Sequence, residues 1–317
     1  MEHRPDPALP ETIAAWFARR GWAPRRHQLD VLEAHRAGES ALLIAPTGAG
    51  KTLAGFLPTL DDLIGAKGLG LHTLYLSPLK ALAVDVARNL TDPVAEMGLG
   101  IRVETRTGDT PASRRQRQRF DPPDILLTTP EQLALLLSHP ESAKLFAGLK
   151  RVVLDELHAL VTSKRGDLLA LGIARLARLA PELKMTGLSA TVAQPEMLAE
   201  WLGAPLAPRP VRLIAAKGGA KPELSILSSG TRIPWAGHSA SYAIPELYEI
   251  IKANGTSLVF VNTRSQAEML FQGLWAINVD DLPVALHHGS LDVEQRRKVE
   301  SAMVAGRRRA VGCTSTL

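Results

Sequence analysis

Short apolar runs alternate with stretches of helical character along most of the chain. In the first part the apolar runs have the length of buried strands, and they are Ala41–Ile44, Thr73–Leu76, Asp124–Leu127, Arg151–Leu154 and Met185–Leu188. Apolar residues between them recur at helical spacing. Strands that alternate with helices predict a mainly parallel sheet covered by helices, so we expect an α/β fold.

The alternation loosens after Gly203 and resumes near Ala240, across a stretch rich in proline and glycine. Beyond it the predicted strands are Ser257–Val261, Val284–His287 and Ala310–Cys313. We predict an N-terminal domain over residues 1–207, a connection over 208–240 and a partial second domain over 241–317. Val211–Ile214, inside the connection, is also compatible with a strand.

Composition narrows the class of protein. A chain of 317 residues suits two ordinary domains, and 45% hydrophobic with 22% charged residues is typical of a folded protein. No apolar run approaches the roughly 20 residues of a membrane span, and the polar start does not resemble a signal peptide, so we expect a cytoplasmic protein. Cys313 is the single cysteine, which excludes an internal disulfide. A net charge of +5 favours a polyanionic partner without proving one.

The stretch Ala45–Thr52 carries the first chemical signal, because it follows a predicted strand and precedes a helical segment. Glycine-rich backbone at a helix N-terminus binds phosphates, a lysine adds charge and a hydroxyl ligates Mg²⁺. The expected nucleotide-binding residues of this loop are Thr47, Gly48, Ala49, Gly50, Lys51 and Thr52. The first position is Ala45, where the general pattern has glycine. The alternative interpretation is an ordinary glycine-rich turn.

Asp155 and Glu156 end a hydrophobic strand downstream of this loop. We expect Asp155 to hold Mg²⁺ together with Thr52, and Glu156 to orient or deprotonate an attacking water. The alternative is a carboxylate pair that favours the start of the next helix. The expected catalytic residues are Lys51, Asp155, Glu156 and His158, although a histidine in the last position is also common at a helix start.

Asp155-Glu156-Leu157-His158 together with Ser189-Ala190-Thr191 resembles the motifs of superfamily 2 DExH-box helicases. Ala45 is usual in that group. Details such as Pro78-Leu79-Lys80-Ala81-Leu82 are similar to the large helicase-related (Lhr) type, including its bacterial ligase-associated branch. The resemblance implies two RecA-like domains, ATP and Mg²⁺ as cofactors, and DNA unwinding with 3′→5′ polarity.

The resemblance also implies roles for individual residues. Arg25 and Gln28 would read adenine, and Ser189 and Thr191 would couple the ATP site to movement through His158. Residues at positions that contact nucleic acid in the family are Pro78, Lys80, Thr107, Gly108, Thr129, Pro130, Glu131, Asn262, Arg264, His288, Gly289, Ser290 and Thr314. The expected partner is single-stranded DNA held by its backbone, with RNA, DNA ligase and repair nucleases as further partners.

The chain stops within the motif that contains Thr314. The arginine-rich motif that supplies an arginine finger in this group does not appear, so we expect an incomplete second domain and slow hydrolysis. The rival functions are an RNA-remodelling ATPase and a fragment that binds ATP or DNA without turnover. A P-loop kinase or GTPase would not explain the order of the later motifs.

Two further expectations concern arginine and tryptophan. The run Arg114, Arg115, Arg117 and Arg119 fits either a stripe that binds phosphates or a solvated helix face. Trp16, Trp201 and Trp275 lie at apolar helical spacing, which predicts core positions instead of base stacking.

Overall fold

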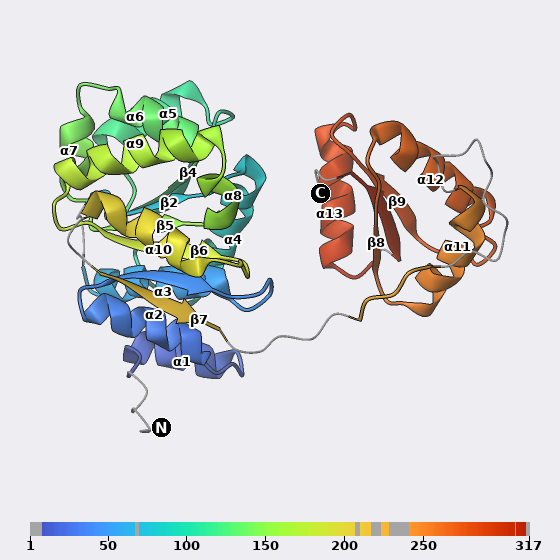
Figure 1. Cartoon of the computed structure of the whole chain (residues 1–317), viewed down its shortest axis with the longest axis horizontal. Coiled ribbons are helices and arrows are strands. Elements are labelled where there is room, and N and C mark those ends of the chain that lie inside the picture. The colour runs from blue at the N-terminus through green and yellow to red at the C-terminus, as the bar shows by residue number, and fades with distance from the viewer. Residues whose placement is uncertain are drawn as a thin grey trace. The chain divides into compact units, whose positions relative to one another are not determined.

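The computed structural model describes residues 8–66, 70–206, 210–216, 223–227, 241–307 and 309–314. Contacts divide the chain into two compact units, Met1–Lys221 and Pro222–Leu317 (Figure 1). Each unit has its own parallel sheet. The α/β fold with a second, smaller parallel sheet is confirmed.

The first unit is built on a seven-stranded sheet with the order β3-β4-β2-β5-β6-β1-β7, in which every pairing is parallel. The strands are β1 (Ser40–Ile44), β2 (Thr73–Leu76), β3 (Val103–Arg106), β4 (Ile125–Thr128), β5 (Arg151–Leu154), β6 (Lys184–Ser189) and β7 (Val211–Ala215). The central strands β2, β4 and β5 are buried at every position, as a sheet covered on both faces requires.

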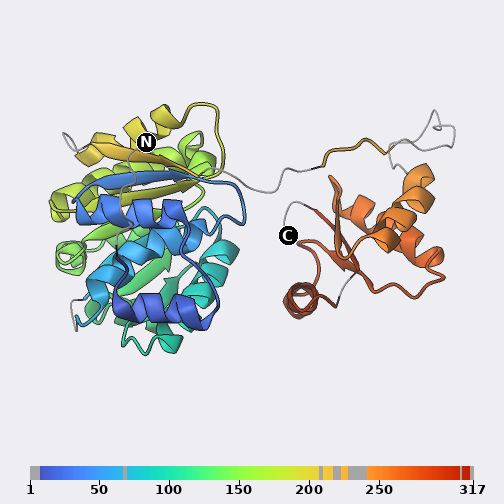
Figure 2. The ribbon, with the colours of Figure 1, turned by 90° about the horizontal axis from the view of Figure 1, so that it is seen from below.

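Helices cover both faces of this sheet (Figures 1 and 2). One core contains residues of α1 (Glu11–Arg19), α2 (Arg26–Arg36), α3 (Lys51–Leu63) and α4 (Lys80–Glu96). The other contains residues of α6 (Pro130–Leu137), α7 (Ser142–Phe146), α8 (Leu157–Val161), α9 (Lys164–Leu179) and α10 (Pro195–Gly203). Leu43 joins the first core and its neighbour Leu42 the second, because successive strand residues point to opposite faces.

One edge strand, β3, was not predicted, and the other, β7, is the possible strand Val211–Ile214 inside the predicted connection. β3 has the sequence Val-Glu-Thr-Arg and only Arg106 is buried, so its apolar signal is too weak to reveal a strand. β7 pairs with β1 from Ser40↔Val211 to Ile44↔Ala215. The first sheet therefore takes in residues that we assigned to the connection, and the division by contacts falls between Lys221 and Pro222.

The second unit has a three-stranded parallel sheet with the order β8-β10-β9. Its elements are α11 (Ile244–Ala253), β8 (Ser257–Phe260), α12 (Arg264–Ala276), β9 (Val284–His287), α13 (Val293–Val304) and β10 (Ala310–Cys313). Helices α11 and α12 share one apolar cluster with Val284 and Ala310, whereas α13 packs through Val299 against Ala285 and Val311. The sheet thus has helices on both faces (Figure 1).

One tryptophan prediction is wrong. Trp16 is buried, but Trp275 is 59% exposed and stacks on Phe271 on the surface of α12. In the described part of the chain, no helix combines the length and apolarity needed to cross a membrane.

Candidate active site

The predicted phosphate loop connects β1 to α3. Gly48 and Gly50 both have φ of +76°, a backbone conformation that favours glycine. The N–H of Ala45 donates to the Ser189 carbonyl at 3.0 Å, which ties the start of the loop to the end of β6. Helix α3 begins at Lys51, so its N-terminus follows the loop directly.

Lys51 is nearly buried, with 8% of its surface exposed. Its Nζ donates to the Ala45 carbonyl at 3.1 Å and lies 3.9 Å from Oε1 of Glu156. An ammonium group in such surroundings is only loosely neutralised, because the carboxylate is at the limit of ion-pair distance. Lys51 is therefore available to an anion at the loop.

Side chains at the start of α2 contact the backbone carbonyls of the same loop. Arg25 Nη1 donates to the Gly48 carbonyl at 3.0 Å, and Gln28 Nε2 donates to the Gly50 carbonyl at 3.2 Å. His27, which the sequence analysis did not select, places Nε2 2.8 Å from the Ala49 carbonyl. Arg25 and Gln28 thus contact the loop's backbone in this structure, and their role toward adenine stays a prediction.

Asp155 follows β5 and is buried beside an unpredicted partner. The Tyr75 hydroxyl donates to Asp155 Oδ2 at 2.5 Å, while the N–H of Glu156 donates to Oδ1 at 2.9 Å. Burial raises the pKa of Asp155, against the hydrogen bond from Tyr75. Burial and the neighbouring Asp155 raise the pKa of Tyr75, on which a hydrogen bond with Thr52 acts in the opposite sense. Thr52, Tyr75 and Asp155 therefore meet in one polar cluster under the loop.

Glu156 has left-handed backbone angles, φ 46° and ψ 45°, and precedes α8. A non-glycine residue rarely adopts these angles, and such strain is typical of functional sites. The carboxylate lies between two basic groups, with Oε1 3.9 Å from Lys51 Nζ and Oε2 3.5 Å from His158 Nδ1. The strained turn thus directs Glu156 toward the phosphate loop.

His158 connects this turn to the end of β6. Its Nδ1 accepts the N–H of Ala190 at 3.3 Å and lies 3.2 Å from Ser189 Oγ. Because Nδ1 is an acceptor, the neutral ring carries its proton on Nε2. Thr191, the other predicted coupling residue, is exposed two positions further along. The structure brings His158 and Ser189 together, and their coupling role stays a prediction.

The predicted nucleic-acid residues of the first unit follow β2, β3 and β4, which are neighbours in the sheet. Thr107 and Thr129 are buried, and the Thr107 hydroxyl accepts the N–H of Asp109 at 3.3 Å. Thr129 precedes α6, which opens with Pro130. The Lys80 side chain lies outside the described part of the structure. Both threonines therefore leave little surface for a nucleic acid in this structure.

Glu131 has a protein partner that the sequence did not reveal. Arg165 donates from Nε to Oε1 at 2.5 Å and from Nη2 to Oε2 at 3.1 Å. This hydrogen bonding, with a smaller contribution from Thr129, lowers the pKa of Glu131 to about 2. Glu131 is consequently an ionised partner of Arg165 at neutral pH.

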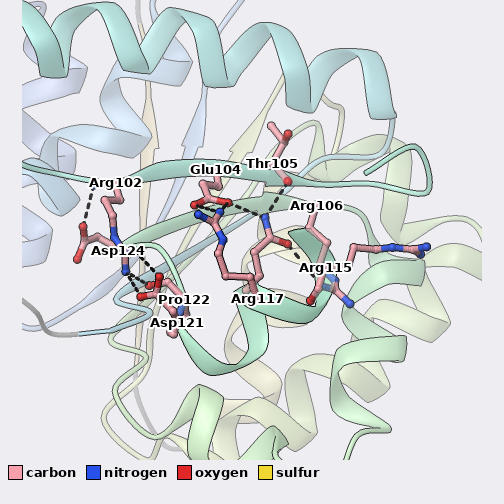
Figure 3. A network of polar contacts seen from close by, with 10 residues as sticks. Arg102, Glu104, Thr105, Arg106, Arg115, Arg117, Asp121, Pro122 and Asp124 are labelled. Atoms are coloured by element: carbon pink, nitrogen blue, oxygen red, sulfur yellow. Dashed lines mark hydrogen bonds and ion pairs between the residues drawn. The ribbon is translucent and has the colours of Figure 1, made fainter. Parts of the chain in front are cut away.

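The arginine run lies on α5 (Ala112–Phe120), beside β3 (Figure 3). Arg117 pairs with Glu104 at 2.5 Å, and Arg106 donates from Nη1 to the Arg115 carbonyl at 2.7 Å. Arg119 Nη1 lies 2.8 Å from His139 Nδ1. Burial, with the charges of Arg115 and Arg119, lowers the pKa of Arg106 to about 10. Arg117 therefore has a structural role, while both interpretations stay open for Arg114 and Arg115.

In the second unit, the predicted residues gather at the carboxyl ends of neighbouring strands. Cys313 pairs with both Phe260 and His287, so the residues that follow these strands lie at one edge of the sheet. Arg264 Nη1 donates to Ser290 Oγ at 2.6 Å, and a Cβ on Gly289 would lie 3.6 Å from Arg264 Nη2. His288 is buried with Nε2 3.3 Å from Glu268. Asn262 is exposed and Thr314 is buried at the same edge.

Comparison with known proteins identifies the family. The DEAD/DEAH box helicase model matches residues 25–198, more than half of the chain. The chain belongs to this family.

Several of the similar proteins are Lhr helicases. The chain is 33% identical to the Lhr helicase/uracil glycosylase of Escherichia coli over all of its own length, but covers 25% of that protein. It is also 33% identical to the ATP-dependent helicase Lhr-Core of Methanocaldococcus jannaschii, covering 94% of this chain and 37% of the relative. The chain thus spans between a quarter and two fifths of these relatives.

A solved structure of Mycobacterium smegmatis helicase Lhr bound to ssDNA and AMP-PNP matches with a TM-score of 0.82 and 35% identity, over 97% of this chain and 42% of that one. The predicted resemblance to Lhr-type helicases is confirmed. The ligase-associated branch stays a prediction.

Proposed function

We propose that the chain is part of an ATP-dependent DNA helicase or translocase that couples ATP hydrolysis to movement on single-stranded DNA. One observation carries the proposal. Lys51, the Asp155-Glu156 pair and the His158–Ser189 contact meet at the carboxyl ends of β1, β5 and β6, which are adjacent in the sheet. Ligand sites of open α/β sheets lie at this edge.

The residues of the loop fit a nucleoside triphosphate. Lys51 offers a poorly neutralised charge, and a Cβ on Gly48 would meet no atom within 4 Å, so the backbone there is open to a ligand. A Cβ on Gly50 would instead lie 2.7 Å from Gln28 Nε2 and would displace that side chain, while the φ of +76° itself favours glycine. We infer that Thr47, Gly48, Ala49, Gly50 and Lys51 bind the phosphates, with Arg25 and Gln28 at the adenine side.

The oxygen donors below the loop fit Mg²⁺. Thr52 and the buried carboxylate of Asp155 are hard oxygen ligands, and a divalent ion would offset the burial that raises the pKa of Asp155. When bound, the ion neutralises charge that develops on the phosphate oxygens.

Glu156 and His158 carry the remaining chemistry of the proposal. The Glu156 carboxylate is directed to the Lys51 side of the loop, where it orients and deprotonates the attacking water. Lys51 stabilises the developing charge electrostatically. His158, which contacts Ser189 and the N–H of Ala190, relays a change at Glu156 to the end of β6.

Single-stranded DNA is the proposed partner. The Mycobacterium smegmatis relative is described with ssDNA and AMP-PNP, which supports DNA and ATP as ligands of this chain. In the proposal the backbone is contacted by the loops after β2, β3 and β4 and by Asn262, Arg264, Ser290 and Thr314 of the second unit. A 3′→5′ direction, a DNA-repair role, ligase or nuclease partners and a cytoplasmic location complete it, supported by the Lhr resemblance alone.

The test is ATP hydrolysis with and without nucleic acid. We expect single-stranded DNA to stimulate turnover more than single-stranded RNA of the same sequence. Lys51→Ala should abolish turnover, whereas Lys150→Ala, which removes an exposed lysine paired with Glu182, should leave it unchanged. Greater stimulation by RNA would favour an RNA-remodelling ATPase, and nucleotide binding without turnover would favour a binding fragment.

A further inference from the structure

Arg165 joins two loops that are far apart in sequence. Besides its two bonds to Glu131, it donates from Nη1 to the Pro78 carbonyl at 2.5 Å. Pro78 follows β2 and Glu131 lies in the first turn after β4, and β2 and β4 are adjacent strands. A single guanidinium group therefore fixes the spacing of two loops at the carboxyl edge of the sheet. We call these three residues the Arg165 clamp.

The chemistry of the clamp requires an arginine. Its planar fork matches a carboxylate with two parallel bonds while a third donor stays free for a carbonyl, whereas a lysine ammonium is a point charge without this geometry. Arg165 lies in none of the predicted motifs. The contacts join loops expected to bind nucleic acid and do not include the phosphate loop.

The clamp also changes what Glu131 does to a polyanion. A free carboxylate at this edge would repel phosphates, but both oxygens of Glu131 accept from Arg165. The pair is partly exposed, with 39% of the Arg165 and 47% of the Glu131 side chain accessible. Glu131 is therefore a poor direct ligand for DNA and a good anchor for Arg165.

The start of α9, packed closely against α8, fixes the position of Arg165. It is the second residue of α9, whose first turn is capped when Ser163 Oγ accepts the Gly166 N–H at 3.3 Å. A Cβ on Gly166 would lie 2.2 Å from the Leu160 carbonyl of α8, so only glycine allows α9 to start this close to α8. Helix α8 begins immediately after Glu156. The clamp is thus attached to the segment that follows the acid pair.

We propose that Arg165 is a positioning residue for nucleic-acid binding, which holds the loops after β2 and β4 at the spacing that fits the phosphodiester backbone of single-stranded DNA. This role rests on the proposed function. Arg165 acts through Pro78 and Glu131 and does not contact the phosphates itself. Glu131 contributes through Arg165 alone.

The experiment measures the Kd of the full chain for a fluorescent oligothymidylate over a series of salt concentrations. Arg165→Gln should raise Kd about tenfold, a loss of about 1.4 kcal/mol. The slope of log Kd against log salt should not change, because no phosphate contact is lost. Arg165→Lys should bind as weakly as Arg165→Gln, since charge without the fork does not restore the clamp. Affinity for a fluorescent ATP analogue should stay at the wild-type level in both.

Two further variants sharpen the result. The double variant Arg165→Gln/Glu131→Gln should bind DNA no more weakly than Arg165→Gln, because both changes break one clamp and the second also removes the carboxylate that Arg165→Gln leaves free. Arg178→Gln is the matched control, since it removes an exposed arginine from the last turn of the same helix, and it should bind like wild type. Should Arg165→Gln not fold, Arg165→Lys tests the same expectation with the charge retained.

The outcomes that contradict the role are distinct. If the slope of log Kd against log salt is smaller by about 0.7 in Arg165→Gln than in wild type, Arg165 contacts a phosphate directly instead of positioning the loops. Each of three results would overturn the clamp but leave the proposed function standing. The double variant would bind DNA more weakly than Arg165→Gln, Arg165→Lys would bind like wild type, or Arg165→Gln would bind like Arg178→Gln. A wild-type chain that binds no oligonucleotide would overturn the proposed function and this role together.

Discussion

The Tyr75 hydroxyl donates a 2.5 Å hydrogen bond to Oδ2 of Asp155, across the adjacent strands β2 and β5. Both residues are buried, and the Tyr75 hydroxyl is the donor to Oδ2 while the Glu156 N–H donates to Oδ1. The contact orients the carboxylate that we propose as the Mg²⁺ ligand. It joins β2, which leads into a loop proposed to bind DNA, to β5, which ends at the proposed Mg²⁺ ligand.

Tyr75→Phe should therefore weaken the response to Mg²⁺ and lower the free energy of unfolding by about 1–2 kcal/mol, because a buried acceptor loses its donor. The measurements are ATP turnover against Mg²⁺ concentration and chemical denaturation. Tyr248→Phe is the control, since it removes a hydroxyl that contacts Asn278 and Asp280 in the second unit. An unchanged Mg²⁺ response in Tyr75→Phe would show that the hydrogen bond does not orient Asp155.

Glu156 combines strain with function. Glu156→Gly should raise the free energy of unfolding by about 0.5–1 kcal/mol, because glycine adopts the φ of 46° freely and a charge beside Asp155 is removed. The same variant should lose turnover. Glu156→Gln keeps the strained backbone, so comparing the two by denaturation separates strain from charge. A less stable Glu156→Gly would contradict the assignment of strain.

A buried charged cluster far from the loop makes stability depend on pH. Arg151 is almost fully buried, with Nη2 3.5 Å from Asp62 Oδ2, and Asp62 also contacts His35 at 2.8 Å and His72 at 3.5 Å. Burial acts to raise the pKa of Asp62, but the His35 hydrogen bond and the charge of Arg151 lower it below 3.8. Burial lowers the pKa of His72 below 6.5, against the charge of Asp62.

The pKa shifts of Asp62 and His72 both predict that the free energy of unfolding decreases as the pH falls. The contribution of His72 declines as the pH falls below 6.5, because only the unfolded chain then takes up the proton. The contribution of Asp62 is present above 3.8 and is lost as the pH falls through its lower folded pKa. Asp62→Asn should cost about 3 kcal/mol at pH 7, because Arg151 is left without its carboxylate.

Denaturation of Asp62→Asn over a range of pH checks this prediction. Asp61→Asn is the control, since Asp61 pairs with the more exposed Arg36 at 2.7 Å and should cost less than about 1 kcal/mol. Equal losses for the two variants would mean that burial of Arg151 does not set the cost. If the free energy of unfolding of the wild-type chain, measured over the same pH range, rises toward acid, the direction of both pKa shifts is contradicted.

Sequence predicted the features that depend on local pattern. Thr73–Leu76 and Arg151–Leu154 coincide with β2 and β5, because short apolar runs between turns have few alternatives in an α/β chain. The strand-loop-helix context of Lys51 is equally local. The polar edge strand β3 gave no such signal, since an edge strand does not need to bury both faces.

Local rules also failed where two signals compete. Ser265 and Glu268 are spaced as a capping box, which by itself predicts that the helix opens at Ser265. The structure begins α12 at Arg264 and uses Thr263 with Gln266. Both pairs satisfy the same spacing rule, so spacing alone does not choose between them.

The partners missed in the site are distant in sequence. Tyr75 and Asp155 are 80 positions apart, and Arg165 and Glu131 are 34 apart. Neither pair has a motif of its own, because the sheet order creates the contact. A tyrosine inside an otherwise apolar strand, whose hydroxyl requires a buried partner, was the one available signal for Tyr75.

The most direct test of the central claim is a comparison of nucleotide binding and turnover in Glu156→Gln. The account predicts that this variant binds ATP and Mg²⁺ as wild type does, because the phosphate loop, Thr52 and Asp155 are intact, while DNA-stimulated hydrolysis falls at least about a hundredfold on losing the base. Full turnover by Glu156→Gln in the presence of single-stranded DNA would contradict it.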